Sequence, residues 1–251
     1  MTDREALVTA TRDTSVRSES DTNCIEALYV TGTTQSQGTR DRRLYQRAKR
    51  AFDVIVAVSL LLLLSPLLLA IALLIKVTTP GPAILTQERV GKGGRVFPFL
   101  KFRSMYDNPD RSSDITFARA YINGEQATAV REDGVFKPAN DRRITPVGRW
   151  LRKTSMDELP QLINILRGDM SLVGPRPSMP YEVEVYKPWH FRRLQVLPGL
   201  TGLAQINGRS NLVFSDIVKI DIDYIEHCSF LLDLSILLRT LPVVLSGNGA
   251  R

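Results

Sequence analysis

The sequence predicts an α+β fold that is mostly helical, with a small β-hairpin and one membrane helix ahead of a compact domain. Three observations lead to this fold class. Residues 54–75 form an uncharged apolar run, residues 83–105 look like two short strands around a glycine-rich turn, and several later segments have helical character. We expect a tail at 1–40, a basic collar with the membrane helix at 41–80, and the compact domain at 81–251.

The charge balance restricts the partners. A net charge of +7 and a pI near 9.6 indicate anionic partners, although net charge alone does not rank nucleic acid, acidic lipid and phosphorylated small molecules. The first 40 residues are rich in Thr, Ser, Gln, Arg and Asp with few apolar residues, so we expect a disordered cytosolic tail.

The apolar run follows the basic collar directly. The collar consists of Arg40, Arg42, Arg43, Arg47, Lys49 and Arg50. Residues 54–75 contain no charge and are long enough to cross a bilayer, since a spanning helix needs about 20 residues. The alternative is a buried helix of a soluble protein, but such helices usually keep a polar face and this segment has none.

Two features argue against a simple crossing. Pro66 removes the backbone hydrogen bond to the carbonyl of Leu62 and should bend the helix, and Ser65 can help to satisfy the freed groups. Both flanks are also basic, whereas lysine and arginine are enriched on the cytoplasmic side. A bent helix that enters one leaflet and returns explains both features, and a single pass stays open at this point.

The domain is expected to begin with a β-hairpin. Residues 83–90 and 95–105 are predicted as strands, with the turn at residues 91–94. Residues 106–139 are predicted as an irregular insertion with one short helix near residues 117–122.

Helices are expected to dominate the rest of the chain. Residues 143–167 have helical character with an interruption at residues 155–160. The last helix that the pattern predicts covers residues 213–226, and residues 230–241 are apolar with Asp233 among them.

Asp157 and Glu158 are the strongest candidates for chemistry. One interpretation is a capping box, with Ser155 at the N-cap and Glu158 three residues later. That interpretation places Pro160 inside the first turns, where it costs a hydrogen bond. If Pro160 instead opens the helix, both acids precede it and lie beside its free N–H groups.

The functional interpretation is a carboxylate that attacks phosphorus. Such a nucleophile forms an acyl-phosphate intermediate and divides a difficult displacement into two steps. An anionic substrate also needs positive charge around it, and the nearby cations are Arg142, Arg143, Arg149, Arg152, Lys153 and Arg176. Mg²⁺ suits a site that combines one or two carboxylates with phosphate oxygens. The chain contains no P-loop, dinucleotide fingerprint or Cys/His metal motif.

An ordered set of motifs makes the sequence similar to a known family. In chain order these are Lys49-Arg-Ala-Phe-Asp53, Ser65-Pro66, Gln87-Glu-Arg-Val-Gly91, Lys101-Phe-Arg-Ser-Met105, Asn140-Asp-Arg-Arg-Ile-Thr-Pro-Val-Gly148, Thr154-Ser-Met-Asp-Glu-Leu-Pro-Gln161, Gly168-Asp-Met-Ser-Leu-Val-Gly-Pro-Arg-Pro177 and Leu197-Pro-Gly-Leu-Thr-Gly202. The chain resembles the bacterial sugar transferase family, the monotopic phosphoglycosyl transferases that begin exopolysaccharide, O-antigen or glycoprotein glycan assembly. The similarity covers roughly residues 49–241. The tail lies outside it, and the segment 106–139 is longer than in the smallest members of the family, so no residue roles carry over to that segment.

The resemblance implies a two-step reaction at Asp157. The family's aspartate attacks the β-phosphate of a nucleotide diphosphate sugar, usually a UDP-sugar, and expels UMP. The sugar phosphate then passes to polyprenyl phosphate, in bacteria undecaprenyl phosphate. Glu158 is expected to assist proton transfer or metal organisation, with Mg²⁺ as the cofactor and Asp157 as its ligand. The residues expected to hold phosphate groups are Lys101, Arg103, Arg149, Arg152 and Arg176.

The resemblance also implies a location and a set of partners. It favours a re-entrant helix broken at Ser65 and Pro66, in the inner membrane of a bacterium, with the catalytic domain on the cytoplasmic face. The expected partners are the UDP-sugar, the polyprenyl phosphate, membrane lipid and a second copy in a homodimer, and nucleic acid is not among them. Two rival functions stay open: a glycosyltransferase that releases UDP, and a basic membrane adaptor without enzymatic activity.

Overall fold

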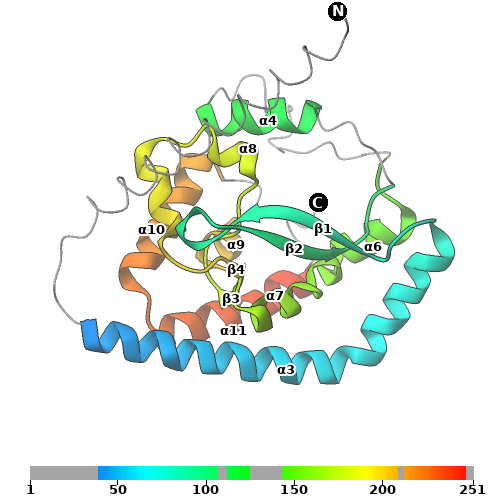
Figure 1. Cartoon of the computed structure of the whole chain (residues 1–251), viewed down its shortest axis with the longest axis horizontal. Coiled ribbons are helices and arrows are strands. Elements are labelled where there is room, and N and C mark those ends of the chain that lie inside the picture. Colours follow the sequence, from blue (N-terminus) through cyan, green and yellow to red (C-terminus); the bar gives the residue numbers. More distant parts are fainter. Residues whose placement is uncertain (1–38, 107–111, 125–142, 209–211, 247–251) are drawn as a thin grey trace, which may run out of the picture. The chain divides into compact units, whose positions relative to one another are not determined.

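A computed structural model describes residues 39–106, 112–124, 143–208 and 212–246 of the chain. It is mostly helical with a small antiparallel hairpin, as the sequence predicts (Figure 1). The predicted tail at 1–40 and most of the 106–139 insertion lie outside the described residues.

Helix α3 extends from Thr39 to Thr78, so the basic collar and the apolar run form one helix of 40 residues. Its cyan C-terminal part turns away from the direction of the blue part (Figure 1). Pro66 lies inside the helix, and the hydroxyl of Ser65 donates a hydrogen bond of 2.8 Å to the carbonyl of Leu62. That carbonyl is the one that Pro66 leaves without its usual N–H donor, so the predicted role of Ser65 is confirmed.

Many leucines of α3 are exposed, which contradicts the alternative of a buried helix in a soluble core. Leu62, Leu63 and Leu69 are each more than 70% exposed. The apolar window of this helix has a mean hydropathy of 2.9 and is only 11% buried. Its length and composition are sufficient to cross a membrane.

The hairpin consists of β1 (Ile84–Val90) and β2 (Val96–Phe102), joined by a 3₁₀ turn at Lys92–Gly94. Val90 pairs with Val96 and Ile84 pairs with Phe102, so the two strands are in full antiparallel register. The turn places Gly93 at a φ of +71°, a conformation that glycine adopts at little cost. The predicted hairpin is confirmed, although β2 ends three residues before Met105.

The remaining elements alternate short helices with single strands. They are α4 (Ser112–Asn123), α6 (Pro146–Lys153), η2 (Met156–Glu158), α7 (Gln161–Arg167), β3 (Ser171–Val173), α8 (Pro180–Val183), η3 (Pro188–Gln195), β4 (Gly199–Thr201), α9 (Leu203–Asn207), α10 (Phe214–His227) and α11 (Phe230–Ser246). Three corrections follow. Helix α4 is longer than the predicted 117–122, the parallel pair β3–β4 was not predicted, and the apolar segment from residue 230 is a further helix.

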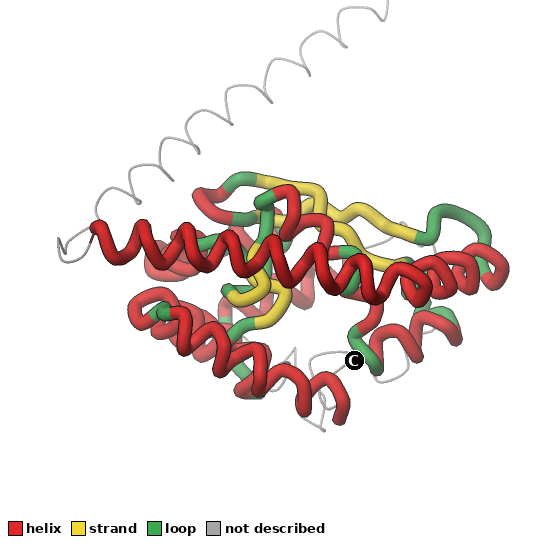
Figure 2. Tube along the Cα trace, turned by 90° about the horizontal axis from the view of Figure 1, so that it is seen from below, coloured by secondary structure: helices red, strands yellow, loops and turns green. Residues whose placement is uncertain are grey.

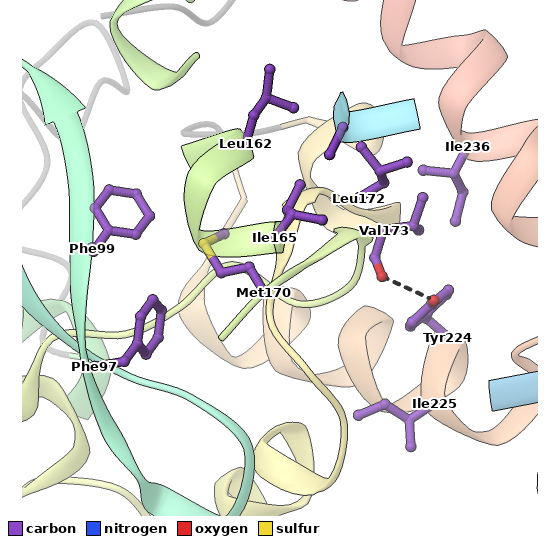
Figure 3. Packing of buried hydrophobic residues seen from close by; sticks show 11 residues of the cluster. Phe97, Phe99, Leu162, Ile165, Met170, Leu172, Val173, Tyr224, Ile225 and Ile236 are labelled. Carbon is purple, nitrogen blue, oxygen red and sulfur yellow. Dashed lines mark hydrogen bonds between the residues drawn. The ribbon is translucent and has the colours of Figure 1, made fainter. Parts of the chain in front are cut away.

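One hydrophobic cluster joins the hairpin to the helices (Figure 3). Phe97 and Phe99 of β2 face Leu162 and Ile165 of α7. The cluster continues through Met170, Leu172 and Val173 to Tyr224, Ile225, Ile236 and Ala57. It therefore includes a residue of α3, and Figure 2 shows α3 crossing the near side of the domain when seen from below.

Polar contacts fix α3 to the domain within the first shared motif. Lys49 forms a 2.7 Å ion pair with the buried Asp233 of α11. The carboxylate of Asp53 accepts a hydrogen bond of 3.1 Å from the N–H of Leu172 in β3. Arg50 donates to the carbonyls of Ile165 and Leu166 in the last turn of α7, and the carbonyl of Ile165 also accepts from the N–H of Gly168. These bonds explain why lysine, arginine and aspartate stand immediately before the apolar run.

A glycine determines how closely α6 approaches the end of β2. A Cβ atom on Gly148 would lie 1.9 Å from the backbone oxygen of Ser104, and no side-chain movement can relieve that contact. We expect Gly148→Ala to destabilise the fold by about 1–3 kcal/mol and to lower the melting temperature of the detergent-solubilised protein.

Gly91→Ala is the matched control for this prediction. Its Cβ would lie 3.2 Å from the ring of Phe97, a contact that a small shift of a side chain relieves, so we expect a smaller loss. Equal melting temperatures for the two variants would contradict the close approach that the structure shows at Gly148.

Candidate active site

Asp157 lies in a short turn between two helices. Helix α6 ends at Lys153, the single turn η2 contains Asp157 and Glu158, and α7 begins after Pro160. Ser155 precedes η2 and its side chain makes no capping hydrogen bond, so the capping-box interpretation is wrong. Both acids precede α7, as the alternative predicted, but Pro160 is the N-cap of the helix and Gln161, not Pro160, is its first residue.

The backbone conformation of this turn is strained. Ser155 has a φ of +56°, and no other non-glycine residue among those described has a positive φ. The left-handed region costs a residue with a Cβ atom about 1–2 kcal/mol. Such strained positions occur often at functional sites, where the surrounding packing holds them in place.

The turn packs against the apolar helix. Met156, the residue before Asp157, contacts a cluster that includes Ile71, Ile75 and Leu151. Ile71 and Ile75 belong to the part of α3 that follows Pro66. The same helix that exposes its leucines therefore supports the position of Asp157.

Burial and a neighbouring negative charge hold a proton on Asp157 more tightly than usual. Burial is the larger effect, and with the charge of Glu158 it raises the pKa of Asp157 to about 6. The cations of Arg152, Arg176 and Lys101 act in the opposite direction. The carboxylate is ionised at neutral pH but holds its charge less readily than an exposed aspartate.

Burial and neighbouring like charges also shift the pKa of Lys101, but in the opposite direction. Burial lowers the pKa of Lys101 to about 8, and the nearby cations of Arg89 and Arg152 add to this effect. Several positive charges therefore lie near one carboxylate, and a phosphate group bound among them would relieve their mutual repulsion.

Glu158 is paired with Arg176. The carboxylate of Glu158 accepts a hydrogen bond of 2.7 Å from the guanidinium of Arg176, and this charge raises the pKa of Arg176. The side chain of Arg176 is nevertheless 47% exposed, so it is accessible to a ligand. The pair connects the Asp157 turn to the Gly174-Pro-Arg-Pro177 loop.

Two arginines that the sequence analysis did not single out hold this loop. Arg89 donates to the carbonyl of Pro177 at 2.9 Å and stacks on Phe99. Arg193 donates to the carbonyl of Arg176 at 3.3 Å. Both therefore position Arg176 through the backbone of its loop.

Arg193 is itself held by a buried network. It forms a 2.7 Å ion pair with Asp221 and donates to the hydroxyls of Ser178 and Tyr186. These partners come from α10 and from segments on both sides of α8, so no local sequence pattern indicates the network. The sequence signal for this network was Asp221, an acidic residue on the buried face of the amphipathic helix α10.

The structure separates the five predicted phosphate ligands. Lys101, Arg152 and Arg176 all act on the charge of Asp157. Arg103 instead donates to the backbone oxygen and the hydroxyl of Thr79 at 2.7 Å, so it contacts the residue that follows α3. Arg149 lies on the exposed face of α6, opposite the buried Leu151.

The carboxylates provide a small donor set for a metal. Asp157 and Glu158 are adjacent, and Mg²⁺ typically takes one or two carboxylates together with substrate phosphates. Within the described ranges, no group of three or more His, Cys, Asp or Glu residues could hold a metal without substrate. The donor set therefore fits a magnesium ion that binds together with a phosphorylated ligand.

The chemistry that this arrangement supports is nucleophilic attack on phosphorus. An ionised carboxylate lies among three cations that can hold phosphate oxygens. Among the described residues, no side chain or backbone group donates a hydrogen bond to the carboxylate of Asp157.

Comparison with known proteins agrees with the motifs. The family model for bacterial sugar transferases matches residues 44–247. The chain is 41% identical over 203 residues to the exopolysaccharide production protein ExoY of Sinorhizobium fredii, covering 81% of this chain and 88% of that protein. It is 42% identical over 210 residues to the UDP-glucose:undecaprenyl-phosphate glucose-1-phosphate transferase of Caulobacter vibrioides, covering 80% and 71%.

A third relative is considerably longer. The undecaprenyl-phosphate galactose phosphotransferase of Salmonella typhimurium is 43% identical over 215 residues, which cover 85% of this chain but only 44% of that protein. The chain thus spans less than half of some relatives and most of others. The match over nearly the whole described structure shows that the chain belongs to the bacterial sugar transferase family.

Proposed function

We propose that this protein transfers a sugar 1-phosphate from a UDP-sugar to polyprenyl phosphate, releases UMP, and so begins the assembly of a surface polysaccharide or glycoconjugate. The observation that carries this proposal is the position of Lys101, Arg152 and Arg176 around the free carboxylate of Asp157. The names of the Caulobacter and Salmonella relatives describe the same class of transfer to undecaprenyl phosphate.

In the first step, an oxygen of Asp157 attacks the β-phosphorus of the UDP-sugar. A new bond forms between this oxygen and phosphorus, and the bond from phosphorus to the oxygen shared with the α-phosphate breaks. UMP leaves with that oxygen, and the sugar phosphate stays on Asp157. Lys101, Arg152 and Arg176 hold the phosphate oxygens while charge develops on the leaving group.

In the second step, a phosphate oxygen of the polyprenyl phosphate attacks the same phosphorus. The bond to Asp157 breaks, and the carboxylate is regenerated as the polyprenyl diphosphate sugar leaves. The proposed role of Glu158, which pairs with Arg176, is to accept or return a proton during these transfers.

Asp157 is the proposed ligand of Mg²⁺, with Glu158 beside it. When bound, the ion would neutralise part of the charge on the phosphate oxygens. This role suits a substrate whose phosphates carry several negative charges.

The proposed location is the inner membrane of a bacterium, with the domain on the cytoplasmic face. Exposed leucines before and after Pro66, the turn of α3 in Figure 1 and the basic residues at both ends of the apolar run support a re-entrant helix. Polyprenyl phosphate presents its phosphate at the headgroup level, which suits a nucleophile held against the same helix.

The covalent step can be trapped. A UDP-sugar labelled in its β-phosphate, added without polyprenyl phosphate, should leave the label on the protein and release UMP. Asp157→Asn should lose label retention and at least about a thousandfold in UMP release, because the nucleophile is gone. Asp223→Asn, an identical change on the exposed side of α10, should retain both.

The nucleotide product separates this reaction from the rival transfer. A panel of UDP-sugars identifies the donor at the same time, since the expected product is UMP in every productive case. Release of UDP would indicate a glycosyltransferase that moves the sugar alone, and full activity of Asp157→Asn would exclude the covalent mechanism.

The pH dependence of the first step follows from the two shifted groups. Asp157 must be ionised, so the rate should fall about tenfold for each pH unit below its pKa of about 6. Lys101 must be protonated, so the rate should also fall above its pKa of about 8. The measurement is kcat/KM for UMP release in single turnovers without acceptor, which avoids titration of the polyprenyl phosphate.

Lys101→Arg tests the alkaline side of this profile. Arginine keeps its charge throughout the range, so the fall above pH 8 should disappear while the fall below pH 6 remains. An alkaline fall that persists in Lys101→Arg would assign it to another group.

The topology has its own test. Arg42 and Thr78 are both exposed near the two ends of α3, whereas Thr79 is buried against Arg103 and is unsuitable for labelling. In a background with Cys24→Ser and Cys228→Ser, both Arg42→Cys and Thr78→Cys should resist an impermeant thiol reagent added from the periplasm. Labelling of Arg42→Cys from outside would instead indicate a single pass.

A further inference from the structure

Asn164 is a polar residue at a fully buried position of α7. Its side chain is 0% exposed, and its neighbours Leu162 and Ile165 belong to the main hydrophobic cluster. A buried amide costs free energy unless its donors and acceptors are bonded, so an apolar side chain would be the simpler choice at this position. The bonds that Asn164 makes therefore indicate what the asparagine does.

The amide of Asn164 bonds to the backbone of β2. Its Oδ1 accepts a hydrogen bond of 3.0 Å from the N–H of Leu100, and its Nδ2 donates one of 2.7 Å to the carbonyl of Pro98. Nδ2 also lies 3.4 Å from a carboxylate oxygen of Asp169, just after α7. Residues two apart in a strand present their backbone groups to the same edge, so the amide bonds to β2 as a neighbouring strand would.

The bonded edge lies between two charged groups of the site. Lys101 follows Leu100 directly in β2, and Asp157 lies four residues before the first residue of α7. Both η2 and α7 contact β2, and Figure 3 shows the apolar part of the contact between β2 and α7. Apolar contacts are not directional, whereas two hydrogen bonds fix the position of the strand along the helix.

The position of Lys101 matters because several charges surround it. Burial lowers the pKa of Lys101 to about 8. The charged groups that act on it come from four different segments: Arg89 of β1, Arg152 of α6, Asp157 of η2 and Arg176 of the loop after β3. In a site that depends on placed charges, a misplacement of about 1 Å can cost about a hundredfold in rate.

We propose that Asn164 is a positioning residue that holds the edge of β2 against α7 and so keeps the ammonium of Lys101 beside Asp157. This role rests on the proposed function, since it concerns the cation that holds the phosphate which Asp157 attacks. A purely structural role would stabilise the fold without a special relation to Lys101. The two roles therefore differ in whether the effect of Asn164 depends on Lys101.

A double-mutant cycle measures this dependence. Asn164→Leu keeps the size of the side chain and removes both bonds to β2, and Lys101→Met removes the ammonium. We expect Asn164→Leu to lower kcat/KM for UMP release by about 10- to 100-fold when Lys101 is present. In the Lys101→Met background the same change should cost less than about threefold, because the group that Asn164 positions is already absent. The measurement uses single turnovers of the full-length protein in detergent.

Arg50→Leu is the matched control. Arg50 also holds α7, through the carbonyls of Ile165 and Leu166, but it does so from α3. Any loss that Arg50→Leu causes should be the same factor with and without Lys101. Equal losses for Asn164→Leu in the two backgrounds would assign Asn164 to stability alone and overturn the proposal. Full activity of Asn164→Leu would also overturn it.

A second measurement follows Lys101 without the reaction. Competitive labelling with acetic anhydride at a series of pH values, read by mass spectrometry, gives the pKa of Lys101 in each variant. Loss of the Asn164 bonds should let Lys101 reach solvent, which raises its pKa from about 8 toward its ordinary value of 10.5. Arg50→Leu should leave this pKa unchanged, and an unchanged pKa in Asn164→Leu would overturn the proposal.

Asn164→Ser is the second variant, for the case that Asn164→Leu does not fold. The smaller side chain leaves room for a water molecule, which can bond to the freed backbone groups of β2. Melting curves identify the folded variants. Both measurements on Asn164→Ser should change in the same direction as for Asn164→Leu, and additive losses with an unchanged pKa would overturn the proposal here as well.

Failure of the proposed function gives a different result. If the unmodified protein releases no UMP with any donor, the reaction is disproved, and the labelling of Lys101 still decides whether Asn164 positions it. If the unmodified protein releases UMP but the losses in the cycle are additive, the role of Asn164 is disproved and the reaction stands.

Discussion

The structure depends on how the apolar helix α3 is joined to the rest of the chain. A helix that exposes Leu62, Leu63 and Leu69 cannot be held to its domain by burying its whole circumference. It uses a narrow buried stripe that includes Ala57, Ile71 and Ile75, together with polar anchors at its N-terminal end. The stripe reaches the main core before Pro66 and the active-site turn after it.

The polar anchors are specific because each satisfies a group that would otherwise be costly to bury. Asp233 is 3% exposed, and it accepts hydrogen bonds from Tyr45, Lys49 and Tyr224. Removing one partner would leave a buried carboxylate less satisfied, which costs more than the bond itself contributes. Such contacts fix the rotation of α3, whereas apolar packing alone would tolerate a slide of the helix.

Much of the local structure could be predicted because local rules determine it. Proline at 66 frees the carbonyl of Leu62, and the nearest hydroxyl on the chain binds it. A helix that begins at Met156 would lose a hydrogen bond at Pro160, which favoured a start after the two acids, and α7 begins at Gln161. The hairpin was predictable for a similar reason, since its glycine-rich turn separates two runs of strand-forming residues.

The contacts of individual arginines were less predictable, because helix phase and strand ends decide them. Arg149 and Arg152 are three residues apart, yet one faces outward and the other binds Ser104. Arg103 follows Lys101 by two residues, but β2 ends between them at Phe102, and Arg103 turns to Thr79. Arg193 and Asp221 are 28 residues apart in sequence, and no local pattern pairs them.

The conformation of the η2 turn determines the surroundings of Asp157, the proposed nucleophile, which is half-buried. In the first turn of a helix, a carboxylate accepts hydrogen bonds from free N–H groups, and these bonds stabilise its charge and weaken it as a nucleophile. The left-handed residue Ser155 and the boundary at Pro160 place Asp157 outside both helices, where no described donor binds its carboxylate. The charges of Arg152, Arg176 and Lys101 stabilise the ionised form of Asp157. The left-handed conformation of Ser155 and the packing of Met156 against α3 lie on either side of this boundary and together position the turn that carries Asp157.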